Sequence, residues 1–339
     1  MRNKSLMTVA VLAVTVLAAT GCGTIGTEPT SAPSNQPSTG TVTTDKGITT
    51  TSTGKTAART LYFVDGNNRV VPMRVELPLT NEPMNEALQY MVAGGPETWL
   101  SGTGLHAPMP TGTKILGINP SGDLVKVSLS AESLTLKDAK QQQALINAVT
   151  WELTEFPNIK QVQIEFNGRI LPTLSPSGIP TGGTLSRDSG INLEVAEDVV
   201  NPADSTKVTV YLDENSSGAH YLVPVTRILP QTADEDIVKE TVSSLHEGAV
   251  GAGLQSPLSP SAELINESVE GKTATLDFSQ SIYQKNQATE AVHALALSLK
   301  ASAGIDQIKI LVNGKVPMQT EGIDFSKVVT APTYVNEIL

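Results

Sequence analysis

The chain has 339 residues, of which 39% are hydrophobic and only 4% aromatic, and its formal net charge at pH 7 is −11. This length provides two domains of ordinary size, whose cores must consist mainly of aliphatic side chains. The acidic balance argues against nucleic-acid binding, because the surplus of Lys and Arg that displaces phosphate counterions is missing. An anionic lipid surface would also repel the folded body.

The first residues have the pattern of a secretory leader. Arg2 and Lys4 form a short positive region. The apolar run over 6–19 is too short to span a bilayer but fits the hydrophobic part of a signal peptide. Ala19-Thr20-Gly21-Cys22 resembles the lipobox of bacterial lipoproteins, with Ala19 standing where leucine is usual. We therefore expect residues 1–21 to be a lipoprotein signal peptide.

Cys22 is the only cysteine of the chain, which excludes an intramolecular disulfide and any cysteine metal cluster. The lipobox resemblance implies that Cys22 is lipidated and becomes the mature N-terminus. Acyl chains bury many methylene groups at about 0.8 kcal/mol each, so a multiply acylated cysteine is a firm anchor. We expect the protein on the extracytoplasmic face of the cell membrane, attached through this lipid alone.

Residues 22–58 are predicted to form a disordered tether rich in Ser, Thr and Pro. Within 23–57, sixteen residues are Ser or Thr and none is aromatic. Such a segment cannot bury enough apolar surface to offset the entropy lost on ordering. It would hold the folded part of the protein away from the lipid surface.

From Leu61 onward the chain repeats itself. Tyr62 and Tyr211 occupy matched positions in similar apolar runs, and Asp123–Ser130 returns as Lys272–Ser279. Further matched segments follow in the same order: Val71-Pro72 with Val223-Pro224, Leu77-Pro78 with Leu229-Pro230, and Val162–Arg169 with Ile308–Lys315. Ordered matches of this kind indicate a duplication. We expect a first domain over 59–200 and a second over 201–339.

Each copy is predicted to be an α+β module with the element order βαββαβ. Val125, Val127 and Leu129 alternate with polar residues, which indicates a strand with one buried face. The two helices of each copy carry apolar stripes at helical spacing, including Leu145, Val149 and Leu153 in one of them. Both helices can cover one face of a small sheet and leave its other face polar.

The sequence offers no catalytic or metal-binding motif. The four histidines do not correspond between the copies and form neither HExxH nor a His-x-His pair. No Gly-x-Ser-x-Gly elbow occurs, and an acylated Cys22 cannot act as a nucleophile. We therefore expect no enzymatic activity, no catalytic residues, no metal and no cofactor.

The order of these segments resembles the GerM domain family of sporulation and spore germination. The residues that carry the resemblance are Leu61–Asp65, Val71-Pro72 with Arg74, Gly95-Pro96, Pro110–Leu116, Val127–Ser130, Asn167-Gly168, Thr184–Asp188 and Gly322–Ser326. The resemblance implies a fold of the ring-building-motif type and a non-enzymatic assembly protein. It also implies a location at the membranes around the developing spore, in the intermembrane space.

The leading hypothesis is therefore an envelope lipoprotein that scaffolds a sporulation or spore germination membrane complex through contacts with other envelope proteins. The alternative, from another class, is an extracytoplasmic lipoprotein that binds a ligand or the cell wall. Trp99 and Leu100, apolar residues in a glycine-rich loop, are the possible interface residues. The sequence does not indicate the oligomeric state.

Overall fold

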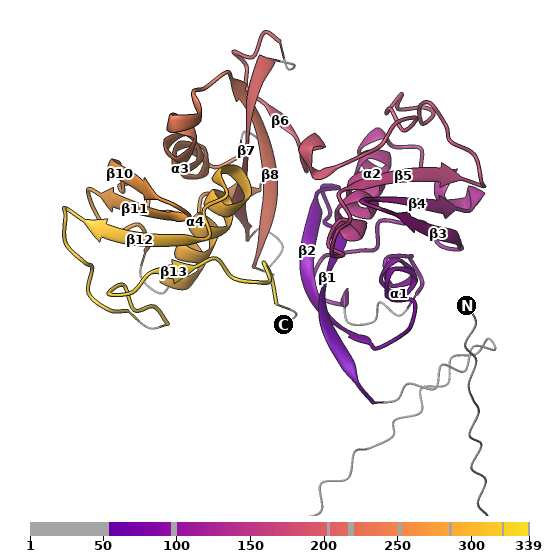
Figure 1. The fold of residues 1–339 in the computed structure, drawn as a ribbon, viewed down its shortest axis with the longest axis horizontal. Coiled ribbons are helices and arrows are strands. Elements are labelled where there is room, and N and C mark those ends of the chain that lie inside the picture. Colours follow the sequence, from indigo (N-terminus) through magenta and orange to yellow (C-terminus); the bar gives the residue numbers. More distant parts are fainter. Residues whose placement is uncertain are drawn as a thin grey trace, which may run out of the picture. The chain divides into compact units, whose positions relative to one another are not determined.

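The computed structural model describes residues 54–95, 100–201, 204–215, 220–249, 253–284, 287–320 and 322–337 (Figure 1). The predicted signal peptide, Cys22 and the predicted tether up to residue 53 lie outside the described residues. Within the described part, no helix combines the length and the apolar character that crossing a bilayer requires.

The structure confirms an α+β fold built from two similar modules, here called copy 1 and copy 2. Copy 1 consists of β1 (Thr56–Val64), β2 (Val70–Pro78), α1 (Pro83–Tyr90), β3 (Ile115–Ser121), β4 (Leu124–Leu129), α2 (Ala139–Leu153) and β5 (Gln161–Phe166). Copy 2 consists of β7 (Ser205–Glu214), β8 (Tyr221–Pro230), α3 (Ile237–Glu247), β9 (Leu254–Gln255), β10 (Leu264–Glu270), β11 (Thr273–Phe278), α4 (Ala288–Ala303), β12 (Gln307–Val312) and β13 (Val329–Thr330). A short strand, β6 (Glu194–Val195), lies on the segment that connects the copies.

Each copy opens with an antiparallel hairpin where the sequence predicted a single strand. β1 pairs with β2 along its whole length, and β7 pairs with β8 in the same way. In copy 1 the turn is closed by Asp65, whose Oδ1 accepts hydrogen bonds from the backbone N–H groups of Asn67 and Arg69, each at 2.8 Å. This local capping by an aspartate makes a tight turn favourable.

β1 also begins earlier than the sequence predicted. Residues Thr56–Ala58, which the composition placed in the tether, pair with the end of β2, Thr56 lying opposite Pro78. The backbone N–H of Leu79 donates to the carbonyl of Lys55 at 3.0 Å and continues this pairing. Hydrogen bonding to a neighbouring strand outweighs the weak intrinsic preference of these small residues.

Apart from β9, which pairs with β7, the remaining strands of each copy form a second sheet. β3 pairs antiparallel with β4, and β4 pairs parallel with β5, so the connection between β4 and β5 crosses over and carries α2. β10, β11 and β12 repeat this arrangement around α4, and β13 extends the sheet. Inward residues such as Val127 and Leu276 are fully buried, whereas their neighbours on the outer face are polar, as expected.

Helices α2 and α4 are buried on more than one face. α2 packs against β1 and β2 and against β5, and α4 packs against β7 and β12. Each helix therefore lies between the hairpin and the three-stranded part of the other sheet in its copy (Figure 1). This explains why polar side chains of α2, such as Glu152 and Thr150, are buried along with its apolar stripe.

Candidate functional site at the junction of the two copies

The edges of β2 and β8 that face away from their hairpin partners approach each other, and these two strands are in contact (Figure 1). Each strand carries a proline at the matched position, Pro72 in β2 and Pro224 in β8. Proline lacks a backbone N–H, so it limits direct ladder formation along such an edge. The remaining backbone groups of both edges need partners from side chains.

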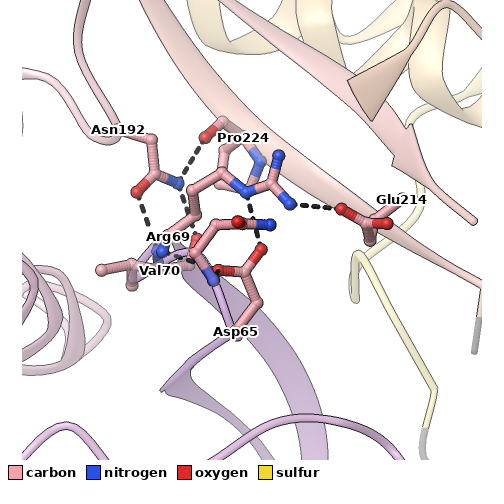
Figure 2. Close-up of polar contacts among 7 residues, drawn as sticks. Asp65, Arg69, Val70, Asn192, Glu214 and Pro224 are labelled. Carbon is pink, nitrogen blue, oxygen red and sulfur yellow. Dashed lines mark hydrogen bonds and ion pairs between the residues drawn. The ribbon is translucent and has the colours of Figure 1, made fainter. Parts of the chain in front are cut away.

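Asn192, from the connecting segment, supplies those partners on one side of the junction. Its Oδ1 accepts from the backbone N–H of Val70 at 2.8 Å, and its Nδ2 donates to the carbonyl of Val70 at 2.8 Å. The same Nδ2 donates to the carbonyl of Pro224 at 2.7 Å (Figure 2). Asn192 has a φ of 49°, a left-handed conformation that asparagine tolerates well.

Asn336, from the C-terminal segment, makes the same three contacts with the copies exchanged. Its Oδ1 accepts from the backbone N–H of Leu222 at 2.7 Å, and its Nδ2 donates to the carbonyl of Leu222 at 2.8 Å. Its Nδ2 also donates to the carbonyl of Pro72 at 2.8 Å. Val70 and Leu222 both lie two residues before their proline. The two asparagines, here called the asparagine clips, therefore give the junction a pseudo-twofold arrangement.

A cluster of buried charges lies beside the first clip (Figure 2). Arg69 donates from Nε to Oδ2 of Asp65 at 2.6 Å and forms an ion pair with Glu214 of copy 2. Asp65 and Glu214 are 1% and 2% exposed. Buried carboxylates require a nearby cation, and Arg69 pairs with one carboxylate from each copy and so couples the two hairpins.

A cavity of about 460 Å³ opens next to this cluster and is lined by both copies. A second cavity, of about 410 Å³, lies between matched residues of the copies: Tyr62 and Tyr211, Thr60 and Thr209, and Pro72 and Pro224. Tyr62 donates to Oε1 of Glu155 at 2.6 Å, and the Arg187 guanidinium lies 4.4 Å from the Trp151 ring centroid. Burial raises the pKa of Tyr211 to about 12, so its hydroxyl remains protonated at neutral pH.

Many polar groups of the junction are paired with one another by hydrogen bonds and ion pairs, whereas Nε1 of Trp151, at the second cavity, has no partner among the described residues. The part of the chain described contains no group of three or more His, Cys, Asp or Glu side chains suited to a metal ion. Burial raises the pKa of Glu152 well above its ordinary value, and burial together with the neighbouring Asp213 raises the pKa of Glu290 to about 7. His220 lies beside this carboxyl pair, with its Nδ1 3.9 Å from Oδ1 of Asp213.

Of the site residues predicted from sequence, only Leu100 is among the described residues, and it lines neither cavity of this junction. Leu100 is 5% exposed and belongs to the hydrophobic core, so its side chain is largely covered within copy 1. Trp99 and Cys22 lie outside the described residues. The clips were missed, although Ile191-Asn192 and Val335-Asn336 form one more matched pair that a longer repeat comparison would contain.

A family model described as sporulation and spore germination (Germane) matches residues 60–172 and 209–317. The chain belongs to this family. The two matched stretches lie within the two copies of the fold, and each includes a hairpin, both helices and the three main strands of the second sheet. The resemblance found in the sequence is therefore confirmed.

Similar proteins carry the same duplication. Spore germination protein GerM of Bacillus subtilis (strain 168) is 30% identical over 295 residues, which cover 83% of this chain and 78% of that protein. The solved structure of the tandem GerMN domains of the sporulation protein GerM from Bacillus subtilis has a TM-score of 0.74 and 28% identity, covering 84% of this chain and all of that one. This chain is a sporulation and germination family member with tandem GerM-type domains.

Proposed function

We propose that this family member is a non-catalytic envelope lipoprotein that scaffolds a sporulation or spore germination membrane complex by docking other proteins. The names of its relatives support the process, and the lipobox-like leader supports the anchored location. The absence of catalytic motifs from the sequence supports binding without turnover. The intermembrane space of the developing spore is the compartment that this proposal implies.

The observation that carries the docking proposal is an exposed apolar side chain at the same place in both copies. β3 and β10 form the outer edges of their sheets. Each has a register shift near its start, at Leu116 in β3 and at Ile265 in β10. Leu116 is 51% exposed and Ile265 is 53% exposed. β-Bulges on edge strands often redirect a side chain, and a bulge at the same place in both copies indicates a functional role rather than a defect of the sheet.

The surroundings of these two residues indicate the kind of partner. In copy 1 a cavity of about 450 Å³ beside Leu116 is lined by apolar residues that include Met84 and Ile118, and Glu82 is at its rim. In copy 2 Glu263 and Glu267 flank Ile265 in the sequence. A second copy of this acidic chain would be repelled. The surface suits a partner segment whose apolar side chains are flanked by Lys or Arg.

The test is recovery of partner proteins from sporulating cells with the full chain carrying Leu116→Asp and Ile265→Asp together. We expect partner recovery to fall about tenfold or more, because a carboxylate at each bulge would be desolvated on docking. Thr275→Asp, on the polar outer face of β11, is the matched control. Thermal unfolding monitors folding of each variant. Unchanged recovery with the folded double variant would remove these edges from the interface, and a turnover abolished by one polar substitution would refute the scaffold role.

A further inference from the structure

The cavity of about 460 Å³ beside the first clip is assigned no role by the proposed docking function. Its wall consists of the β1–β2 turn, one face of α2, the connecting segment, and β8 and β9 of copy 2. Cavities of this size that are shared between domains are common positions for small-molecule sites. The side chains that line it determine which ligand it could hold.

One carboxylate, Glu194, lines this cavity, and it is paired with Arg227, whose Nε lies 3.4 Å from Oε2 of Glu194. Asn147 and Lys140 offer donors that are unpaired among the described residues. Asn147, which is 7% exposed, uses Oδ1 to accept from Nε2 of Gln143 at 2.8 Å. Its Nδ2 has no hydrogen-bond partner among the residues that the structure describes. Lys140 also lines the cavity, and its ammonium forms no ion pair with any described residue. Arg69, by contrast, is neutralised by Asp65 and Glu214. The free groups therefore favour an anionic acceptor.

The rest of the lining is small and apolar. Ala144 of α2, Val225 of β8 and Leu254 of β9 contribute aliphatic surface, and Leu193 is a half-exposed residue at the rim. No aromatic side chain lines this cavity, so a sugar ring would have no stacking surface. A short chain with methyl-sized side chains and amide groups fits this lining better. The asparagine and glutamine amides at the wall can pair with its peptide groups.

Copy 2 does not repeat this chemistry. Its corresponding helix, α4, carries Glu290 in its first turn, and the Glu290 carboxyl is hydrogen-bonded to that of Asp213. A carboxylate ligand would meet two acidic groups there. The donor-rich cavity is thus a feature of copy 1, although the two copies share one fold.

We infer that this cavity binds the free C-terminal carboxylate of a short peptide with small apolar side chains. The carboxylate pairs with Lys140 and accepts from Nδ2 of Asn147, and the methyl groups contact Ala144 and Val225. This chemistry has two sources: the C-terminus of a protein, made of L-residues, or a peptide of the cell wall, which contains D-residues. The inference does not depend on docking at Leu116 and Ile265.

The probes are N-acetyl-L-alanyl-L-alanine and N-acetyl-D-alanyl-D-alanine, titrated into the full chain by calorimetry up to about 10 mM, with the C-terminal amides as uncharged counterparts. We expect one enantiomer to bind in the millimolar range or tighter. The amide form and the Lys140→Met variant should each weaken binding about tenfold, because both remove the ion pair. Lys239→Met, on the exposed face of α3, is the matched control.

The outcomes distinguish a cell-wall peptide from a protein C-terminus, and they distinguish this inference from the docking proposal. Preference for the D-peptide supports a wall ligand, and preference for the L-peptide supports a protein terminus. Absence of binding by both peptides, or equal binding by wild type and Lys140→Met, would overturn the inference. Because Lys140 is exposed, its substitution should leave the fold intact, as thermal unfolding would verify. Partner recovery with the Leu116 and Ile265 variants is measured separately, so failure here leaves the docking proposal standing.

Discussion

The carboxyl groups of Asp213 and Glu290 lie next to each other in copy 2. Asp213, at the end of β7, is 4% exposed, and its side chain is hydrogen-bonded to that of Glu290 in the first turn of α4. Burial raises the pKa of Glu290 to about 7, and repulsion by Asp213 adds to this effect. Burial also raises the pKa of Asp213, although Glu290 and His220 oppose the rise. The pair therefore shares a proton near neutral pH.

This pair should make stability depend on pH. The pKa of Glu290 is about 7 in the folded chain against an ordinary value of 4.5, so the folded state holds the proton more strongly. The stabilisation is complete below about pH 4.5 and is lost as the pH rises through 7. We expect Glu290→Gln to unfold in urea close to the wild-type midpoint at pH 5 and at a clearly higher one at pH 8, where the wild type has lost this stabilisation.

Glu270→Gln, on the exposed edge of β10, is the control for this prediction, and it should give the same difference from wild type at both pH values. If Glu290→Gln shifted the midpoint equally at pH 5 and pH 8, the two carboxyl groups would not share a proton as described.

Individual residues show which features the sequence could predict and which it could not. Alternation correctly predicted the inward positions of Val127 and Leu276, because a buried strand face imposes a period of two. Asn192 and Asn336 could not be recognised from such a pattern. Their role depends on two strand edges from distant parts of the chain, and an asparagine in a loop usually has only local partners. The burial of Leu100 likewise depends on tertiary packing.

At the scale of elements, the sequence predicted the helices and the second sheet of each copy. It did not predict the hairpin. The turn between β1 and β2 contains Gly66 and four polar residues, so a hairpin signal was present, but the segment was predicted as a single strand. The contact between the edges of β2 and β8 depends on this hairpin, so the sequence did not predict it either.

The clips make a prediction about these strand edges. Removing the side chain of Asn192 leaves three buried backbone groups without their partner, and each unsatisfied group costs about 1–3 kcal/mol. We expect Asn192→Ala and Asn336→Ala each to lower the free energy of unfolding by about 2–4 kcal/mol, measured by urea denaturation. Similar losses are expected for both, because the contacts are equivalent.

Asn266→Ala, at an exposed position of β10, is the control, with an expected change within about 0.5 kcal/mol. The clips would be dispensable if Asn192→Ala and Asn336→Ala unfolded like this control. A large loss for one clip alone would contradict their equivalence.

At the scale of the whole molecule, one hydrophobic core includes residues of both copies, from Leu61 in β1 to Ile310 in β12. The segment that connects the copies is hydrogen-bonded to copy 2, since β6 pairs with β8 and the backbone N–H of Thr226 donates to the carbonyl of Ile191 at 2.8 Å. The predicted division into 59–200 and 201–339 therefore places β6 with copy 1, whereas its hydrogen bonds are with a strand of copy 2. Composition could not reveal this pairing, because β6 is only two residues long.

The proposed attachment of the protein to the membrane depends on Cys22. We predict that Cys22→Ala blocks maturation or releases the protein from membranes, because the acidic folded body has no affinity for an anionic lipid surface. Fractionation of cells, with immunoblotting of the membrane and soluble fractions, measures the outcome. Ser52→Ala, in the predicted tether, is the control. A mature, processed Cys22→Ala protein that still sedimented with membranes would show that something other than a lipid anchors it.

The two asparagine clips make the same contacts with the copies exchanged, and this has a consequence for how the duplicated chain evolved. A single-copy ancestor with one such asparagine would satisfy its own strand edge and the proline carbonyl of an identical neighbour, and so form a symmetric dimer. That dimer would dissociate on dilution. Fusion of two genes makes the same contact intramolecular, at an effective concentration set by a short connection rather than by expression level. The duplicated chain can then stay paired even when very few molecules are made.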